Sequence, residues 1–234
     1  MGDRLHEVTF ELREGEILGL AGLVGSGRTE VASALFGTMA YDSGEICIDR
    51  KTVCIRSTPD AINRDIALVP EERRRQGLVM SMNVRENATL PNLRSFKLVY
   101  WLPQILSRKK ETLSTKKIVQ SLSIQTSGMG QVVEFLSGGN QQKLVLGKWL
   151  IGKRKVMIFD EATRGIDVGS KFEIYKLVRQ LANEGVGVLY ISSELEELVG
   201  VCDRIIVLRH GRIIREMTAN QTTVEEVLNY CYGN

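Results

Sequence analysis

Residues 16–36 constrain the fold of this chain most strongly, because they join an apolar run to a helical pattern through a glycine-rich turn. Residues 16–21 predict a buried strand, and residues 30–36 repeat apolar side chains at helical spacing. The turn between them reads Gly22-Leu23-Val24-Gly25-Ser26-Gly27-Arg28-Thr29. A strand that enters a helix through such a turn is typical of α/β folds, in which the turn lies at the carboxyl edge of a parallel sheet.

The glycines of this turn, Gly22, Gly25 and Gly27, favour a phosphate site. Without side chains the backbone can curl so closely that successive N–H groups point at phosphate oxygens, and the following helix adds its positive end. Thr29 stands where a hydroxyl would ligate Mg²⁺, but Arg28 occupies the position of the usual lysine. Because a planar guanidinium is larger than an ammonium, we expect nucleotide binding to survive this change more readily than catalysis. The alternative is a glycine-rich turn that binds no ligand.

A pair of acidic residues, Asp160 and Glu161, follows the apolar run 156–159. If that run is a parallel strand, both carboxylates lie at the sheet edge that also holds the glycine-rich turn. Asp160 would then hold Mg²⁺, directly or through water, and Glu161 would polarise the attacking water in phosphoryl transfer. The alternative is a helix start that attracts acidic side chains through its dipole.

A third segment, residues 136–143, opens a predicted helix with the sequence LSGGNQQK. Ser137, Gly138 and Gly139 leave backbone N–H groups free and add a hydroxyl, which together suit an anion. In isolation the segment is also consistent with an ordinary capped helix. It becomes specific in combination, because few folds place a second anion-binding helix start just before an acidic strand.

The rest of the chain alternates predicted strands and helices. We expect strands at residues 7–12, 45–48, 66–69, 156–159 and 186–191, helices at 140–151, 170–183 and 223–230, and a hairpin from 204–208 to 212–217. Residues 71–123 are polar, irregular and helical in pattern. The predicted fold class is α/β, with a mostly parallel sheet and flanking helices, N-terminal antiparallel strands, a core at about 1–70 and 150–234, and a helical subdomain at about 71–149.

The composition excludes several classes of protein. A chain of 234 residues, 43% of them hydrophobic, is long enough for one sizeable core. Its 31 basic and 28 acidic residues leave a net charge of +3, which is too weak to favour nucleic-acid binding. The four cysteines lack the paired spacing of a zinc site, and no apolar run reaches the roughly 18 residues of a membrane span. We therefore expect reduced thiols and, at most, a peripheral membrane role.

In this order and combination, the three motifs resemble the nucleotide-binding domain of an ABC transporter, a P-loop NTPase. More narrowly, the chain is similar to the second, C-terminal ATPase half of bacterial sugar importers of the ribose, xylose, arabinose and galactose type. The likeness rests on residues 25–30, 136–143, 160–169 and 192–195, which read GSGRTE, LSGGNQQK, DEATRGIDVG and SSEL. It covers almost the whole chain.

The resemblance implies roles for individual residues, with ATP and Mg²⁺ as cofactors. The nucleotide would be bound by Gly22, Gly25, Ser26, Gly27, Arg28, Thr29 and Glu71. The signature, which contacts the ATP of a partner domain, would be formed by Ser137, Gly138, Gly139 and Gln141. The metal ligands would be Thr29 and Asp160. Asp167 matches an aspartate that contacts the partner across the dimer interface.

Two further positions depart from the family pattern. Glu71 stands where a glutamine contacts Mg²⁺ and the membrane subunit, and Ser193 stands at the position of the switch histidine. The only histidines, His6 and His210, lie elsewhere in the sequence. A serine hydroxyl cannot hold a positive charge near the γ-phosphate as a histidine can, so this departure also argues against efficient turnover. Glu161 and Ser193 are therefore the predicted catalytic positions, in a site that holds ATP without rapid hydrolysis.

The family also implies partners. The aromatic residue that stacks on adenine and a complete first ATPase domain have no counterpart in the chain, so we expect a fragment of a longer two-domain polypeptide. Its partners would be the N-terminal ATPase domain, in a head-to-tail dimer, the transmembrane permease subunits and, indirectly, a periplasmic or extracellular sugar-binding protein. The expected location is the cytoplasmic face of the bacterial membrane.

Aromatic residues near Phe96, namely Tyr100 and Trp101, precede a basic run at residues 108–110. In the family this region neighbours a groove that receives a helix of the membrane subunit, so docking is one interpretation. We favour the other, in which the aromatics form the core of the subdomain and the basic run is a solvated face.

Two functions from different classes follow from these features. The first is an ATPase domain that couples ATP binding and hydrolysis to sugar import, with a signature that completes the partner's site and a degenerate site of its own. The alternative is a nucleotide-dependent regulatory clamp that never hydrolyses ATP. A soluble ABC protein that acts on ribosomes or DNA is disfavoured by the modest charge.

Overall fold

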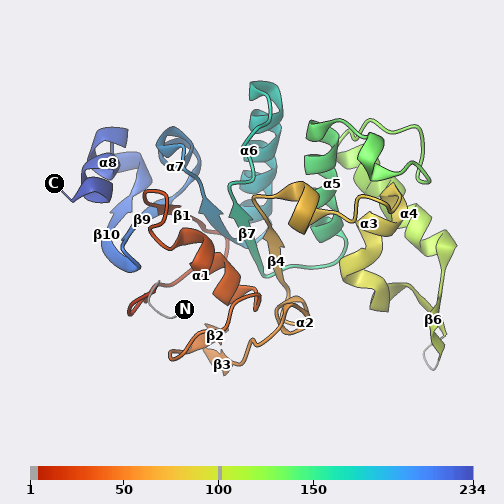
Figure 1. Ribbon diagram of the computed structural model, residues 1–234, viewed down its shortest axis with the longest axis horizontal. Helices are drawn as coiled ribbons and strands as arrows, with labels where there is room; N and C mark the ends of the chain where they lie inside the picture. Colours follow the sequence, from red (N-terminus) through yellow and green to blue (C-terminus); the bar gives the residue numbers. More distant parts are fainter. Residues whose placement is uncertain (1–4, 100–101, 234) are drawn as a thin grey trace. The chain divides into compact units, whose positions relative to one another are not determined.

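The computed structural model describes residues 5–99 and 102–233 of the chain (Figure 1). The chain divides into two compact units, one made of residues 1–68 and 155–234 and the other of residues 69–154. Among the described residues, no helix combines the length and the apolar character that crossing a membrane requires.

The first unit is built on a six-stranded sheet with the order β10-β9-β1-β8-β7-β4. The strands are β1 (Ile17–Ala21), β4 (Ile66–Val69), β7 (Val156–Asp160), β8 (Gly187–Ile191), β9 (Arg204–Arg209) and β10 (Arg212–Thr218). Strands β7, β8, β1 and β9 are parallel, and β10 returns antiparallel to β9. The structure thus confirms the mostly parallel sheet and the terminal hairpin expected from the sequence.

Helices cover this sheet because its central strands are apolar along their whole length. Every residue of β1 and β8 is buried, as in parallel strands that are covered on both faces. The helices of the unit are α1 (Arg28–Leu35), α2 (Thr58–Ile62), α6 (Val168–Asn183), α7 (Leu195–Val201) and α8 (Val224–Tyr232), with a 3₁₀ turn at Ala219–Gln221. Figure 1 shows α1 below the sheet and α6 and α7 above it.

The strand register brings three chain segments to one edge of the sheet. Ile191, the last residue of β8, pairs with Leu20 on one side and with Asp160 on the other. The residues that directly follow β1, β7 and β8 are therefore neighbours in space. These are the glycine-rich turn, the segment that starts at Glu161 and the segment 192–194, so the register by itself assembles a site at the carboxyl edge.

The strand expected at residues 7–12 does not form. Glu7 adopts a φ of 52°, in the left-handed region, which interrupts an extended strand at its start. The alternation of apolar and polar residues was therefore a misleading signal there. A small antiparallel sheet does occur, but it consists of β2 (Ile46–Ile48) and β3 (Lys51–Val53).

The second unit is mainly helical, with one hairpin that the sequence pattern did not indicate. Its elements are a π-helix at Arg73–Gly77, α3 (Val84–Thr89), a 3₁₀ segment at Leu90–Phe96, β5 (Lys97–Val99), β6 (Leu102–Leu106), α4 (Arg108–Ser121), a 3₁₀ turn at Val133–Phe135 and α5 (Gly138–Leu150). The run 97–106 is rich in aliphatic and aromatic residues and includes a proline, features that favour a short hairpin over the expected helix.

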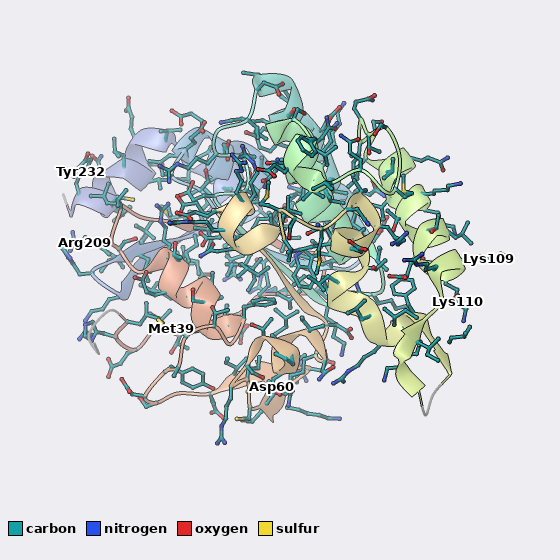
Figure 2. The ribbon with its side chains drawn as sticks, turned by 45° about the vertical axis from the view of Figure 1, so that its right-hand side comes forward. Met39, Asp60, Lys109, Lys110, Arg209 and Tyr232 are labelled. Atoms are coloured by element: carbon teal, nitrogen blue, oxygen red, sulfur yellow. The ribbon has the colours of Figure 1, made fainter. Side chains whose placement is uncertain are left out.

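The aromatic and basic residues of this unit lie in different environments. Phe96 is buried, whereas Tyr100 and Trp101 lie outside the described residues. Residues 108–110 are exposed, and Figure 2 shows Lys109 and Lys110 pointing away from α4. The basic run is therefore a solvated face of the isolated chain.

Candidate functional site

The glycine-rich turn owes its shape to glycines that occupy backbone conformations which residues with a side chain rarely adopt. Gly25 and Gly27 have φ values of 82° and 108°, in the region that favours glycine. A Cβ on Gly22 would lie 2.4 Å from both the Ser26 hydroxyl oxygen and the Leu208 carbonyl oxygen. Only a residue without a side chain therefore allows the loop to close over the start of α1.

Ser26 supports the assignment of this loop to an anion. Its hydroxyl oxygen is buried and has no hydrogen-bond partner among the described residues. Leaving a buried hydroxyl unsatisfied is unfavourable by about 1–3 kcal/mol, so such groups normally have a partner. A phosphate oxygen in the loop would supply one, which is how these residues fit a nucleotide.

Arg28, the first residue of α1, turns its guanidinium toward the ends of two neighbouring strands. Nη1 donates to the Ser192 carbonyl oxygen at 2.6 Å, and Nη2 lies 3.2 Å from Glu161 Oε1. Only 8% of the Arg28 side chain and 10% of the Glu161 side chain are exposed. The residue that replaces the usual lysine is thus tied to the predicted catalytic carboxylate.

Glu161 is held from its other side by Ser193. Both the backbone N–H and the hydroxyl of Ser193 donate to Glu161 Oε2, each at 3.0 Å. Glu161 itself has a φ of 50°, a left-handed conformation that is unfavourable for a residue with a side chain and is often found at functional sites. The structure therefore brings Arg28, Glu161 and Ser193 into one connected cluster.

Thr29 and Asp160 form a second pair at the same edge. The Thr29 hydroxyl donates to Asp160 Oδ1 at 3.4 Å, and Thr29 is exposed. Hydroxyl and carboxylate oxygens are the ligands that Mg²⁺ prefers, and Mg²⁺ takes its remaining ligands from phosphates and water. No group of three or more potential metal-ligating His, Cys, Asp or Glu side chains occurs among the described residues.

Asp167 lies seven residues after Asp160, at the N-cap of α6. Its carboxylate accepts hydrogen bonds from the backbone N–H and the hydroxyl of Ser170, at 3.0 and 2.7 Å. These bonds hold the pKa of Asp167 below its ordinary value. The residue is exposed, so its cap leaves it accessible on the surface of the unit.

The signature residues and Glu71 belong to the second unit. Ser137 caps α5 and accepts from the backbone N–H of Asn140 at 3.4 Å and from its side-chain amide at 2.8 Å. A Cβ on Gly138 would lie 2.8 Å from Nη2 of Arg73, so the absence of a side chain lets a cationic group approach the helix start. Gly139 follows in the first turn of the helix.

Gln141 is placed differently from the other signature residues. It is buried, and its amide nitrogen donates to the carbonyl oxygens of Val133 and Leu136, at 3.1 and 3.2 Å. These bonds fasten the start of α5 to the preceding turn. The side-chain amide of Gln141 therefore donates its hydrogen bonds to backbone carbonyl groups of the second unit.

Sequence reasoning missed Glu197, a buried carboxylate on α7 that contacts the segments next to Arg28 and Glu161. Its oxygens accept hydrogen bonds from the hydroxyls of Ser192 and Thr163, at 2.9 and 2.7 Å. In the sequence it is one of three acidic residues close to a helix start, where such residues are common. No local signal therefore distinguished it.

Comparison with known proteins identifies the family of the chain. Residues 5–164 match the protein family described as ABC transporter. The chain is 45% identical, over 97% of its length, to a ribose import ATP-binding protein of Chelativorans sp.. It is 42% identical, over 99% of its length, to the ribose import ATP-binding protein of Shouchella clausii, and 43% identical, over 98%, to the xylose import ATP-binding protein of Geobacillus kaustophilus. These alignments cover 44%, 46% and 45% of the three relatives, so the chain spans less than half of their length.

Solved structures share the fold at lower sequence identity. A nucleotide-free ATP-binding cassette from an ABC transporter superposes with a TM-score of 0.80 at 19% identity, covering 100% of this chain and 90% of that one. A dimeric cassette in a post-hydrolysis state, bound to ADP and Pi, gives a TM-score of 0.78 at 20% identity, with 93% and 91% coverage. The chain therefore belongs to the ABC transporter family.

Proposed function

We propose that this chain is the second ATP-binding domain of a bacterial monosaccharide importer, with a nucleotide site of its own that binds ATP-Mg²⁺ and hydrolyses it slowly. The observation that supports slow hydrolysis is the buried ion pair between Arg28 and Glu161. A carboxylate that is already paired with a guanidinium and bonded twice by Ser193 is a poor acceptor for a proton from water.

Different residues of the site would bind the phosphates and the Mg²⁺ ion. The backbone of the glycine-rich turn and the Ser26 hydroxyl would contact the phosphates, and Thr29 and Asp160 would hold Mg²⁺. When bound, this metal supplies positive charge that offsets the charge of the phosphate oxygens. Ser137, Gly138 and Gly139 would contact the ATP held by the N-terminal ATPase domain, in a head-to-tail pair.

The assignment to sugar import rests on the relatives, whose names describe ribose and xylose import. The implied partners are the N-terminal ATPase domain, transmembrane permease subunits and, indirectly, a sugar-binding protein. The implied location is the cytoplasmic face of the membrane. Retention of the chain by vesicles that contain a ribose-type permease and the N-terminal ATPase half, and not by vesicles without the permease, tests this part.

The nucleotide part is tested by measuring ATP binding and hydrolysis with Mg²⁺ over a range of protein concentrations. We expect the wild-type chain to bind ATP and to hydrolyse it only slightly faster than Glu161→Gln. The double variant Arg28→Lys, Ser193→His should hydrolyse ATP at a rate that rises faster than linearly with concentration, because the working site needs two copies. Adding Ser137→Ala to this variant should lower the rate again.

Other outcomes contradict the proposal at defined points. Wild-type turnover well above that of Glu161→Gln would refute the degenerate site, and absence of ATP binding would refute the nucleotide site itself. If the double variant binds ATP but stays inactive in the presence of the N-terminal domain, the regulatory clamp becomes the better description.

A further inference from the structure

Five donors from three chain segments converge on the carboxylate of Glu197, a residue that is only 5% exposed. They are the hydroxyls of Thr163 (2.7 Å), Tyr175 (2.7 Å), Tyr190 (3.1 Å) and Ser192 (2.9 Å) and the ammonium of Lys171 (3.0 Å). Burial by itself would raise the pKa of Glu197, but these hydrogen bonds outweigh it and hold the pKa below its ordinary value. The Glu197 carboxylate is therefore ionised, and both of its oxygens accept hydrogen bonds from the surrounding side chains.

One branch of this network leads to the nucleotide site through Ser192. The Ser192 hydroxyl donates to Glu197 and accepts from the backbone N–H of Glu194 at 3.0 Å. The carbonyl oxygen of the same residue accepts the 2.6 Å bond from Arg28. Glu197 thus fixes the acceptor that determines where the guanidinium lies.

A second branch leads to the segment between Glu161 and α6. Thr163 lies two residues after Glu161 and bonds Glu197 directly. Lys171, in the first turn of α6, pairs with Glu197 and also with Glu194, while its backbone N–H donates to the carbonyl oxygen of Asp167 at 3.1 Å. The turn that carries the predicted dimer contact is therefore tied to the same carboxylate.

We infer that Glu197 is a positioning residue, which couples the loop 163–167 to the placement of Arg28 against Ser192 and Glu161. The inference rests on the proposed function, because it takes Arg28, which pairs with Glu161, to contribute to nucleotide binding as well. Glu197 would act on nucleotide binding through Ser192 and Thr163, without contacting the nucleotide itself. It acts by fixing the position of the loop 163–167 relative to Ser192, because it is hydrogen-bonded to both.

Glu16 offers a matched control within the same unit. It is also a buried carboxylate, and it pairs with Arg204 at 2.7 and 3.0 Å and accepts from the backbone N–H of Arg13 at 2.8 Å. It stands just before β1, whereas the nucleotide site lies where β1 ends. Glu16→Gln removes a comparable buried charge without reaching Arg28.

The test is a set of ATP affinities measured with Mg²⁺ on the full chain, for Glu197→Gln and Glu16→Gln in the wild-type and Arg28→Ala backgrounds. Glutamine keeps the shape of Glu197 but turns an amide NH₂ toward groups that are themselves donors. We expect Glu197→Gln to weaken ATP binding about tenfold in the wild type and to have little further effect in Arg28→Ala. Glu16→Gln should leave the affinity unchanged in both backgrounds, even though it lowers the thermal stability.

Ser192→Ala serves as a second variant, since it removes the connecting hydroxyl and leaves Glu197 in place. It should show the same dependence on Arg28, and it decides the question if Glu197→Gln does not fold. An equal loss of affinity in both backgrounds, or a loss in Glu16→Gln as large as in Glu197→Gln, would reduce Glu197 to a stabilising residue and overturn the inference. Wild-type-like binding by both Glu197→Gln and Ser192→Ala would overturn it as well, whereas failure of the wild type to bind ATP would instead refute the proposed function.

Discussion

Arg28 and Glu161 form a buried ion pair, with 3.2 Å between Nη2 and Oε1, although 133 positions separate them in the sequence. The pair joins the start of α1 to the end of β7, and the Ser192 carbonyl oxygen completes the environment of the guanidinium. Buried ion pairs add little net stability, but removing one partner leaves an uncompensated charge and is strongly destabilising. The relationship therefore has consequences for stability as well as for nucleotide chemistry.

The first prediction concerns this pair. Arg28→Met should lower the free energy of unfolding by about 3 kcal/mol, because the Glu161 carboxylate is left buried and unpaired. Adding Glu161→Gln should restore part of that loss, since the double variant no longer buries a charge. Urea unfolding of the wild type, both single variants and the double variant gives the coupling free energy, which we expect to be about 1–3 kcal/mol. Additive losses would mean that the two groups do not interact in solution.

A second prediction follows from Lys148, a buried lysine of α5. Its ammonium donates to the Gly77 carbonyl oxygen and lies 5.2 Å from the centre of the Trp149 ring, and burial lowers its pKa to about 8. Between this value and 10.5 the unfolded chain carries more protons than the folded chain, so stability must rise with pH. Relative to Lys148→Met, the wild type should gain up to about 3 kcal/mol from pH 8 to pH 10.5.

Urea unfolding of both proteins at several pH values measures this difference. Other titrating groups are common to the two proteins and cancel in the subtraction. A pH-independent difference would show that Lys148 keeps an ordinary pKa in the folded chain.

A third prediction uses Gly147, at the contact between α5 and α4. A Cβ there would lie 2.3 Å from Ile118 Cγ2 and 3.1 Å from Leu122 Cδ1. Gly147→Ala should therefore destabilise the chain by about 1–3 kcal/mol, even though alanine is the better helix former. Ile118→Ala should have a smaller effect in this background than in the wild type.

Gly200 in α7 provides the control for that experiment. A Cβ at Gly200 meets no heavy atom within 4 Å among the described residues. Gly200→Ala should therefore be neutral or stabilise by up to about 1 kcal/mol in thermal or urea unfolding. Equal effects of the two alanine substitutions would contradict the close approach of α4 and α5.

A fourth prediction separates the four cysteines. Cys47 and Cys54 are exposed, whereas Cys202 and Cys231 are buried, and burial raises the pKa of both buried thiols. Because the thiolate is the reactive form, iodoacetamide should modify the first two in the native chain and all four in urea. Mass spectrometry of the labelled peptides measures this, and rapid native labelling of Cys202 would indicate local opening near α7.

Much of the fold was predictable from local patterns, because apolar runs and glycines act over a few residues. The strands that became β1, β7 and β8 and the hairpin of β9 and β10 lie within a few residues of their expected positions. The errors have the same origin. Residues 7–12 alternate like a strand, but no local pattern reports the left-handed Glu7, and the hairpin of β5 and β6 was hidden in a segment of irregular polar character.

The sequence by itself determined the candidate residues of the site, because glycines and a hydroxyl suit phosphate and two acids at the end of one strand suit a metal ion and water. Only the tertiary structure decided how those residues engage one another. Arg28 reaches Glu161 and Ser192 because the register of β1, β8 and β7 brings their ends together, and Glu197 gathers donors from segments that are far apart in the chain. Hydrogen bonds and ion pairs act over about 3 Å, so they depend on distances in space that sequence separation does not report.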